Sequence, residues 1–253
     1  MNDVIVVKCG GSTLQELSDH FYSSMKLLKE MNVTPIIVHG GGPEISRLLD
    51  KLNVQSEFVN GLRKTTAEVL EIVEMVLTGK VNKFLVTKLQ LAGVDSLGLS
   101  GCDAALIKAK PIDFEQLGFV GEVVKVNELF LQQILSLNVV PVIAPIGIDD
   151  HGNHYNINAD TAAGAIAESV SAKKMIFVTD VDGIIMDQKL QRQVSVLEIE
   201  EMIENGTIYG GMIPKVKAAM KCLQGNIEEV HIINGKSGNL MTNGELIGTK
   251  IVS

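Results

Sequence analysis

Two glycine clusters near the start of the chain, each following an apolar run, are the residues best suited to chemistry. Gly10 and Gly11 follow the run at residues 4–7, and residues 40–42 follow the run at 35–38. Glycine lets backbone N–H groups approach an anion, and the helix after such a turn adds the positive end of its dipole. Tight turns alone could explain either cluster, but two after consecutive strands favour a site for phosphate or carboxylate.

Two lysines are placed to neutralise such an anion. Lys8 ends the first apolar run, so its stem is expected to be packed and its ammonium to face the glycines. A solvated lysine at a strand end is the alternative. Lys215 follows Gly210 and Gly211 at the start of a predicted helix, where a cation opposes the helix dipole and calls for a compensating anion. If the helix register slips, Lys217 takes its place.

Three further polar residues complete the candidate site. Asp160 could accept hydrogen bonds from lysine ammonium groups and hold them in place. The alternative is that Asn158 or Asp160 is simply a helix N-cap. Asn156 lies in the same polar segment. Arg63 suits a bidentate grip on a carboxylate, although a surface arginine before a helix is the commoner case.

Several function classes are excluded by motif. The chain has no GxxxxGK[ST] run and no GxGxxG after a strand, so neither a Walker ATPase nor a dinucleotide dehydrogenase is supported. HExxH, GxSxG and the protein-kinase catalytic loop are also absent from the sequence. His151 and His154 lie in a polar loop without a third type of metal ligand, so we expect no metal site there. Asp180 and Asp182 could hold magnesium, but Asp before Gly is also an ordinary turn.

The elements that must position these residues alternate between short β-branched runs and stretches of helical period. Strand, glycine turn and helix occur twice in about fifty residues, which is typical of a parallel sheet with crossover helices. We predict strands at 4–7, 35–38, 104–110, 119–126, 139–144, 175–179 and, as the last clear strand, 230–233. We predict helices at 14–30, 43–52, 66–77, 81–92, 127–137, 160–170, 196–204 and 210–222. Residues 148–158 are expected to be polar turns.

Composition narrows the partners and the compartment. The 253 residues are 46% hydrophobic and carry a formal charge of -8, which argues against nucleic acid or an anionic membrane as a partner. Three cysteines, far apart and without a CxxC pair, fit free thiols in a reducing cytoplasm. The first residues match neither a signal peptide nor a membrane span, so we expect a cytoplasmic protein.

Six motifs in order resemble the amino acid kinase family, from about residue 4 to residue 249. They lie at residues 8–12, 38–43, 61–63, 156–160, 179–183 and 210–215. The resemblance implies an α/β fold, an open three-layer αβα sandwich around a mainly parallel sheet, with a cleft between two lobes. Residues 1–172 would bind the acid substrate and form a dimer interface, and residues 173–253 would bind ATP.

The resemblance also implies a reaction, in which the γ-phosphoryl group of ATP moves to the side-chain carboxylate of N-acetyl-L-glutamate in arginine biosynthesis. A carboxylate is already ionised at pH 7, so no general base is needed and none of the five histidines has to be catalytic. Mg²⁺ would be held mainly by the phosphates. A kinase of N-acetyl-aminoadipate, carbamate, aspartate or glutamate, and a non-catalytic nucleotide or amino-acid sensor, remain alternatives.

The implied roles are as follows. Lys8 and Lys215 stabilise the transition state, and Asp160 orients them. The acid is bound by Gly41, Gly42, Arg63 and Asn156, and phosphate by Gly10 and Gly11. The residues that line the nucleotide-binding site are Thr179, Asp180, Val181, Asp182, Gly183, Ile184, Thr207, Ile208 and Tyr209. Arginine-inhibited members of the family carry an extra amino-terminal helix, so the short start here implies a homodimer without arginine feedback.

Overall fold

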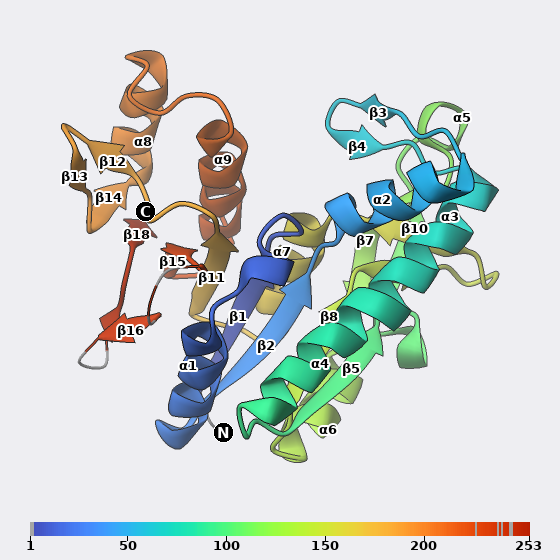
Figure 1. The fold of residues 1–253 in the computed structure, drawn as a ribbon, viewed down its shortest axis with the longest axis horizontal. Helices are drawn as coiled ribbons and strands as arrows, with labels where there is room; N and C mark the ends of the chain where they lie inside the picture. The colour runs from blue at the N-terminus through green and yellow to red at the C-terminus, as the bar shows by residue number, and fades with distance from the viewer. Residues whose placement is uncertain (1–2, 226, 237, 239, 243–244) are drawn as a thin grey trace.

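The computed structural model describes residues 3–225, 227–236, 238, 240–242 and 245–253. An eight-stranded sheet in the order β14-β18-β15-β11-β1-β2-β8-β5 runs through the molecule (Figure 1). Its central strand, β1 (Asp3–Cys9), pairs in parallel with β2 (Val33–His39) on one side and with β11 (Lys174–Thr179) on the other. The predicted mainly parallel sheet is confirmed.

Helices cover both faces of this sheet, because alternate residues of each buried strand point to opposite faces. Val7 lies in a core shared with α1 (Asp19–Glu30) and the helices that follow β2, whereas Val6 lies in a second core shared with α7 (Ala159–Ser169) and the carboxy-terminal helices. The result is the predicted αβα sandwich (Figure 1).

Two predicted helix boundaries were wrong. The stretch 14–30 is a 3₁₀ turn, Leu14–Glu16, followed by α1, because the Ser18 hydroxyl accepts a hydrogen bond from the Phe21 N–H and caps a new helix. The helices predicted at 66–77 and 81–92 are joined. In the structure α3 (Ala67–Glu74) continues through a π-helical segment, Met75–Val81, into α4 (Asn82–Leu91).

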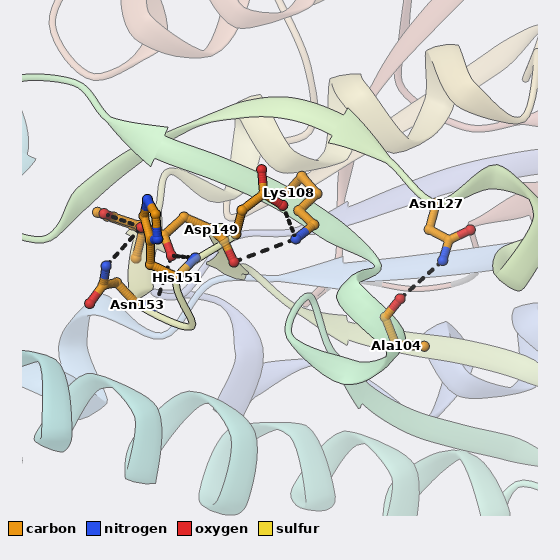
Figure 2. Close-up of polar contacts among 8 residues, drawn as sticks. Ala104, Lys108, Asn127, Asp149, His151 and Asn153 are labelled. Atoms are coloured by element: carbon orange, nitrogen blue, oxygen red, sulfur yellow. Dashed lines mark hydrogen bonds and ion pairs between the residues drawn. The ribbon is translucent and has the colours of Figure 1, made fainter.

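A smaller closed sheet packs beside the large one, in the order β10-β7-β6-β9. It contains the two strands predicted at 104–110 and 119–126, which are β6 (Ile107–Pro111) and β7 (Val120–Val126) and pair antiparallel. The segment expected to be only turns contains strand residues, because β9 (Ile146–Ile148) and β10 (His154–Ile157) form a hairpin. The Asp149 carboxylate closes it by accepting hydrogen bonds from the N–H groups of His151 at 2.8 Å and Asn153 at 2.9 Å (Figure 2).

Three strands of the large sheet were not predicted: β5 (Ser96–Ser100), β14 (Gln193–Ser195) and β18 (Thr249–Val252). The last of these follows β15 (Glu229–Asn234), which is therefore not the final strand. The remaining elements are α2 (Gly42–Leu52), α5 (Phe114–Leu117), α6 (Glu128–Ser136), α8 (Val196–Glu204), α9 (Met212–Leu223), the 3₁₀ turn Asp103–Ala105, β3 (Phe58–Val59), β4 (Leu62–Arg63), β8 (Val140–Ala144), β12 (Ile185–Met186), β13 (Lys189–Leu190), β16 (Met241–Thr242) and β17 (Glu245–Leu246).

The boundary expected between residues 172 and 173 falls between α7 and β11, and the large sheet continues across it through the β1–β11 pairing. All three cysteines are free, as expected. Within the described part of the chain, no helix has the length and apolarity needed to cross a membrane.

Candidate active site

The two glycine loops lie against each other at the carboxyl ends of β1 and β2. The Gly40 N–H donates to the Cys9 carbonyl at 3.0 Å, and the Gly10 N–H donates to the Val178 carbonyl at 3.2 Å. A Cβ on Gly11 would lie 2.8 Å from the Gly41 nitrogen and 2.9 Å from the Gly42 nitrogen. Only glycine leaves this approach open, so the two clusters form one backbone surface.

This surface has the character of an anion site because α2 begins within it. Gly41 is the N-cap residue and Gly42 the first helical residue, with Pro43 in the first turn. The two amide nitrogens approach one point beside Gly11, at the positive end of the helix dipole.

Lys8 brings its ammonium to the first glycine loop. Its side chain is 15% exposed, and a Cβ on Gly10 would lie 3.8 Å from Nζ. Nζ forms an ion pair with Asp160 Oδ1 at 2.8 Å. The ring centre of Phe177, on β11, lies 5.9 Å from Nζ. The lysine is therefore packed and paired rather than solvated.

Asp160 is free to pair with Lys8 because another residue caps its helix. The Asn158 side chain accepts hydrogen bonds from the N–H groups of Asp160 at 2.9 Å and Thr161 at 3.2 Å. The capping role that either residue could have filled thus belongs to Asn158, and the Asp160 carboxylate is left facing the lysine.

Lys215 has a different partner from the expected one. It lies in the first turn or so of α9, and Nζ donates to Asp180 Oδ1 at 2.7 Å. This hydrogen bond lowers the pKa of Asp180. Asp180 directly follows β11, whose Val178 pairs with Cys9 of β1, so the two ion pairs sit at the same end of neighbouring strands. Lys217 is exposed.

Arg63 is 8% exposed, and its guanidinium contacts residues of α2 and of the loop that follows it. It donates to the hydroxyl groups of Ser56 and Ser46, each at 2.7 Å, and to the Gly42 carbonyl at 3.3 Å. The Phe58 ring centre lies 4.6 Å from the guanidinium carbon. Burial lowers the pKa of the arginine, which nonetheless stays cationic near neutral pH.

Asn156 connects to Arg63 through one intermediate residue. Its Nδ2 donates to the Thr65 hydroxyl at 3.1 Å, and that hydroxyl donates to the Arg63 carbonyl at 2.8 Å. Thr65, Ser46 and Ser56 were not predicted, because isolated hydroxyl residues in polar segments have no characteristic spacing.

The segment expected to line a nucleotide forms a turn after β11. The Val181 N–H donates to the Thr179 hydroxyl at 3.2 Å, and the Ile184 N–H donates to the Thr249 hydroxyl at 2.8 Å. Gly183 has a φ of 141°, which favours glycine. Asp182 accepts a hydrogen bond from Asn234 at 2.8 Å.

The other predicted nucleotide segment, residues 207–209, lies between α8 and α9. Ile208 is buried and its N–H donates to the Met202 carbonyl at 2.8 Å, whereas Tyr209 is 76% exposed. The structure also has a cavity of about 1000 Å³ at the opposite, amino ends of the strands, bordered by Asp3, Lys174 and Glu229. It is far along the sheet from the glycine loops, so it is not part of this site.

Comparison with known proteins shows which family this chain belongs to. The model of the amino acid kinase family matches residues 3–234. The chain is 52% identical over 251 residues to an acetylglutamate kinase of Halalkalibacterium halodurans, covering 99% of this chain and 96% of that protein.

Solved structures agree with the sequence relatives. A Streptococcus mutans protein superposes with a TM-score of 0.86 at 32% identity, covering 100% of this chain and 99% of that one. An N-acetylglutamate synthase of Neisseria gonorrhoeae, in complex with coenzyme A and N-acetyl-glutamate, gives 0.85 at 22% identity over 99% of this chain and 59% of its own, which shows the shared fold. With a family match across both glycine loops and both lysines, the chain belongs to the amino acid kinase family.

Proposed function

We propose that this protein is an acetylglutamate kinase, which transfers the γ-phosphoryl group of ATP to the side-chain carboxylate of N-acetyl-L-glutamate. Acetylglutamate kinases about half identical to this chain over nearly their whole length support the assignment. The product is an acyl phosphate of the arginine biosynthetic route.

One observation carries the mechanism: two lysines from distant parts of the chain are each paired with a carboxylate at the same end of the neighbouring strands β1 and β11. Bringing an anionic carboxylate to a γ-phosphate is opposed by charge repulsion, so catalysis needs positive charge and in-line positioning more than proton transfer. When ATP binds, the ammonium groups of Lys8 and Lys215 would each exchange part of their contact with the carboxylate partner for contacts with the phosphoryl oxygens. Asp160 and Asp180 hold the two ammonium groups in place until ATP arrives.

We place the acid in the lobe of residues 1–172. Arg63 would bind one substrate carboxylate in exchange for a serine hydroxyl, Asn156 would add a polar contact, and the Gly41 and Gly42 amides would bind the carboxylate that is phosphorylated. Gly10 and Gly11 would face the transferred phosphoryl group.

We place ATP in the lobe of residues 173–253, along residues 179–184 and 207–209. Mg²⁺ would supply charge neutralisation on the phosphates. Among the residues that the structure describes, no three His, Cys, Asp or Glu side chains gather as a metal site. The Mg²⁺ would arrive with the nucleotide and keep most of its water.

A coupled assay with N-acetyl-L-glutamate and Mg-ATP tests the function, with an ATP-dependent hydroxamate assay across N-acetyl-aminoadipate, carbamate, aspartate and glutamate as the comparison. Preference for N-acetyl-L-glutamate is expected. A preference for the longer aminoadipate side chain would reassign the substrate, and ATP binding without turnover of any acid would identify a sensor.

We further propose a cytoplasmic homodimer. Sedimentation at several concentrations should give twice the 27.3 kDa mass of one chain. A monomer or a hexamer would contradict this.

A further inference from the structure

A buried histidine lies directly behind the second glycine loop, and the mechanism above does not use it. His39 is the last residue of β2 and is fully buried. Its Nδ1 is 2.9 Å from the carbonyl oxygen of Gly40, and its Nε2 is 3.2 Å from Nδ2 of Asn82. The imidazole therefore bridges the glycine loop to the start of α4.

Asn82 is also fully buried, and its partners fix which way its amide points. Nδ2 donates to the Val142 carbonyl at 2.8 Å and lies 3.2 Å from the Leu99 carbonyl, while Oδ1 accepts from Lys83 at 3.1 Å. Two carbonyls face the nitrogen and an ammonium faces the oxygen, so the NH₂ group must be the atom turned toward His39.

The partners of the ring dictate the tautomer of His39. A carbonyl oxygen can only accept, so Nδ1 carries the proton and donates it to the Gly40 carbonyl. Nε2 is then an acceptor, and it shares the two amide protons of Asn82 with the Val142 and Leu99 carbonyls. Burial lowers the pKa of His39 to about 4, and Lys83 contributes to the same direction. The ring is therefore neutral at pH 7, and its one proton points at the glycine loop.

The Gly40 carbonyl shares a planar peptide with the Gly41 N–H, and in a trans peptide the two point in opposite directions. Holding the carbonyl toward His39 turns the Gly41 N–H away from it, toward Gly11 and the anion surface. The other side of Gly40 is also fixed, since its N–H donates to Cys9. A single rotation about this peptide would remove one amide from the site.

The π-helical segment Met75–Val81 completes this support. A Cβ on Gly41 would lie 2.5 Å from Leu77 Cδ2, and the segment ends immediately before Asn82. The π-helical segment therefore packs against the glycine loop and places Asn82 behind that loop. Single π-turns within helices are often found at functional sites.

We propose that His39, oriented by Asn82, is a positioning residue that aims the Gly41 amide at the acid substrate. The assignment of that substrate as N-acetyl-L-glutamate rests on the proposed function, whereas the hydrogen-bond relay does not. His39 is fully buried, so in this proposal it acts only through the Gly41 amide. Because that amide is proposed to bind the acid, loss of His39 should change the KM for the acid without changing the KM for ATP.

Three variants separate this role from simple core packing. His39→Leu keeps the volume and removes both hydrogen bonds. His39→Asn places an amide nitrogen near the position of Nδ1 and can still donate to the Gly40 carbonyl. His231→Leu is the matched control, because His231 is also buried in the large sheet, on β15 near its amino end.

We expect His39→Leu to lower kcat/KM for the acid about 10-fold to 100-fold, the range for a displaced positioning contact, with His39→Asn restoring a substantial part. His231→Leu should lower the melting temperature without changing the ratio of the two KM values. Equal losses in His39→Leu and His39→Asn, or an unchanged acid KM in both, would overturn the proposal.

The ¹⁵N chemical shifts of the wild-type His39 ring give a readout that does not depend on turnover or on variant stability. They should show a neutral ring protonated at Nδ1. A proton on Nε2 at pH 7 would refute the relay even if the enzyme is active. If the wild type instead prefers another acid, the variants are compared on that acid, so failure of the substrate assignment is distinguishable from failure of the relay.

Discussion

The part of the candidate site that we propose for the acid, the acid side, and the part that we propose for ATP, the nucleotide side, are built differently. On the acid side, Gly11 touches Gly41 backbone to backbone and the guanidinium of Arg63 is buried among fixed partners. On the nucleotide side, the Lys215 side chain is 30% exposed and its partner Asp180 is 41% exposed. Fixed contacts therefore already organise the acid side in the structure without ligand. The more exposed side chains of the nucleotide side leave room to adjust around ATP.

The two lysines give the largest expected effect. Lys8→Ala and Lys215→Ala should each lower kcat by about 10²-fold to 10³-fold, as removal of a preorganised charge-stabilising donor does. Initial rates at saturating acid and ATP measure this. Lys217→Ala, an exposed lysine of the same helix, is the control. A near-normal rate in either variant removes that lysine from the mechanism, and a large loss in Lys217→Ala would move the role to that residue.

Gly11→Ala should come next, with activity reduced by about 10²-fold, because the new methyl group would push apart backbone atoms that must stay in register. The matched control is Gly164→Ala in α7, where the added Cβ meets only the Cys222 sulfur at 3.4 Å. That control should keep its rate and gain about 0.5 to 1 kcal/mol in unfolding free energy. Full activity in Gly11→Ala would show that the two loops do not act as one surface.

Arg63→Ala should raise the KM for the acid by at least about 10-fold and leave the KM for ATP nearly unchanged, since the arginine lies wholly on the acid side. Arg63→Lys should not rescue it, because an ammonium cannot replace the planar fork. Steady-state kinetics with each substrate varied in turn give both constants. Equal changes in the two KM values would argue against a carboxylate clamp.

The smallest effect concerns stability at acid pH. The folded-state pKa of His39, about 4, is below its unfolded value of about 6.5, so the unfolded state binds the extra proton first. The free energy of unfolding should therefore fall as pH decreases from about 6.5 to 4. Above about pH 6.5 the stabilising contribution of His39 should be fully present. Urea titrations of wild type and His39→Asn measure it. An identical pH slope in the variant would show that His39 is not buried neutral.

The sequence predicted the residues at the ends of β1 and β2 better than it predicted the partner of Lys215, for a physical reason. Lys8, Gly10, Gly11 and residues 40–42 lie at strand ends, where local pattern and parallel pairing determine position. The pairing of Lys215 with Asp180, rather than with Asp160, depends on how α9 packs against β15 and β18, which no local pattern encodes.

The elements that were missed share the same cause. Strands β14 and β18 are short and partly polar, so their place in the sheet depends on partners far away in the chain. The β9–β10 hairpin lies within a segment whose polar residues predicted turns, and its Asp149 carboxylate accepts backbone N–H groups. Likewise, no periodicity distinguishes His39 from any other residue at the end of a buried strand.

The central place of β1 has a consequence for biosynthesis. Ile5 pairs with Lys174, so about 170 further residues must be synthesised before the edge of β1 that pairs with β11 is covered. Until then an apolar strand edge stays open, and such edges invite association with other chains. The nascent protein should therefore be most prone to aggregate, and most dependent on chaperones, just before β11 emerges from the ribosome.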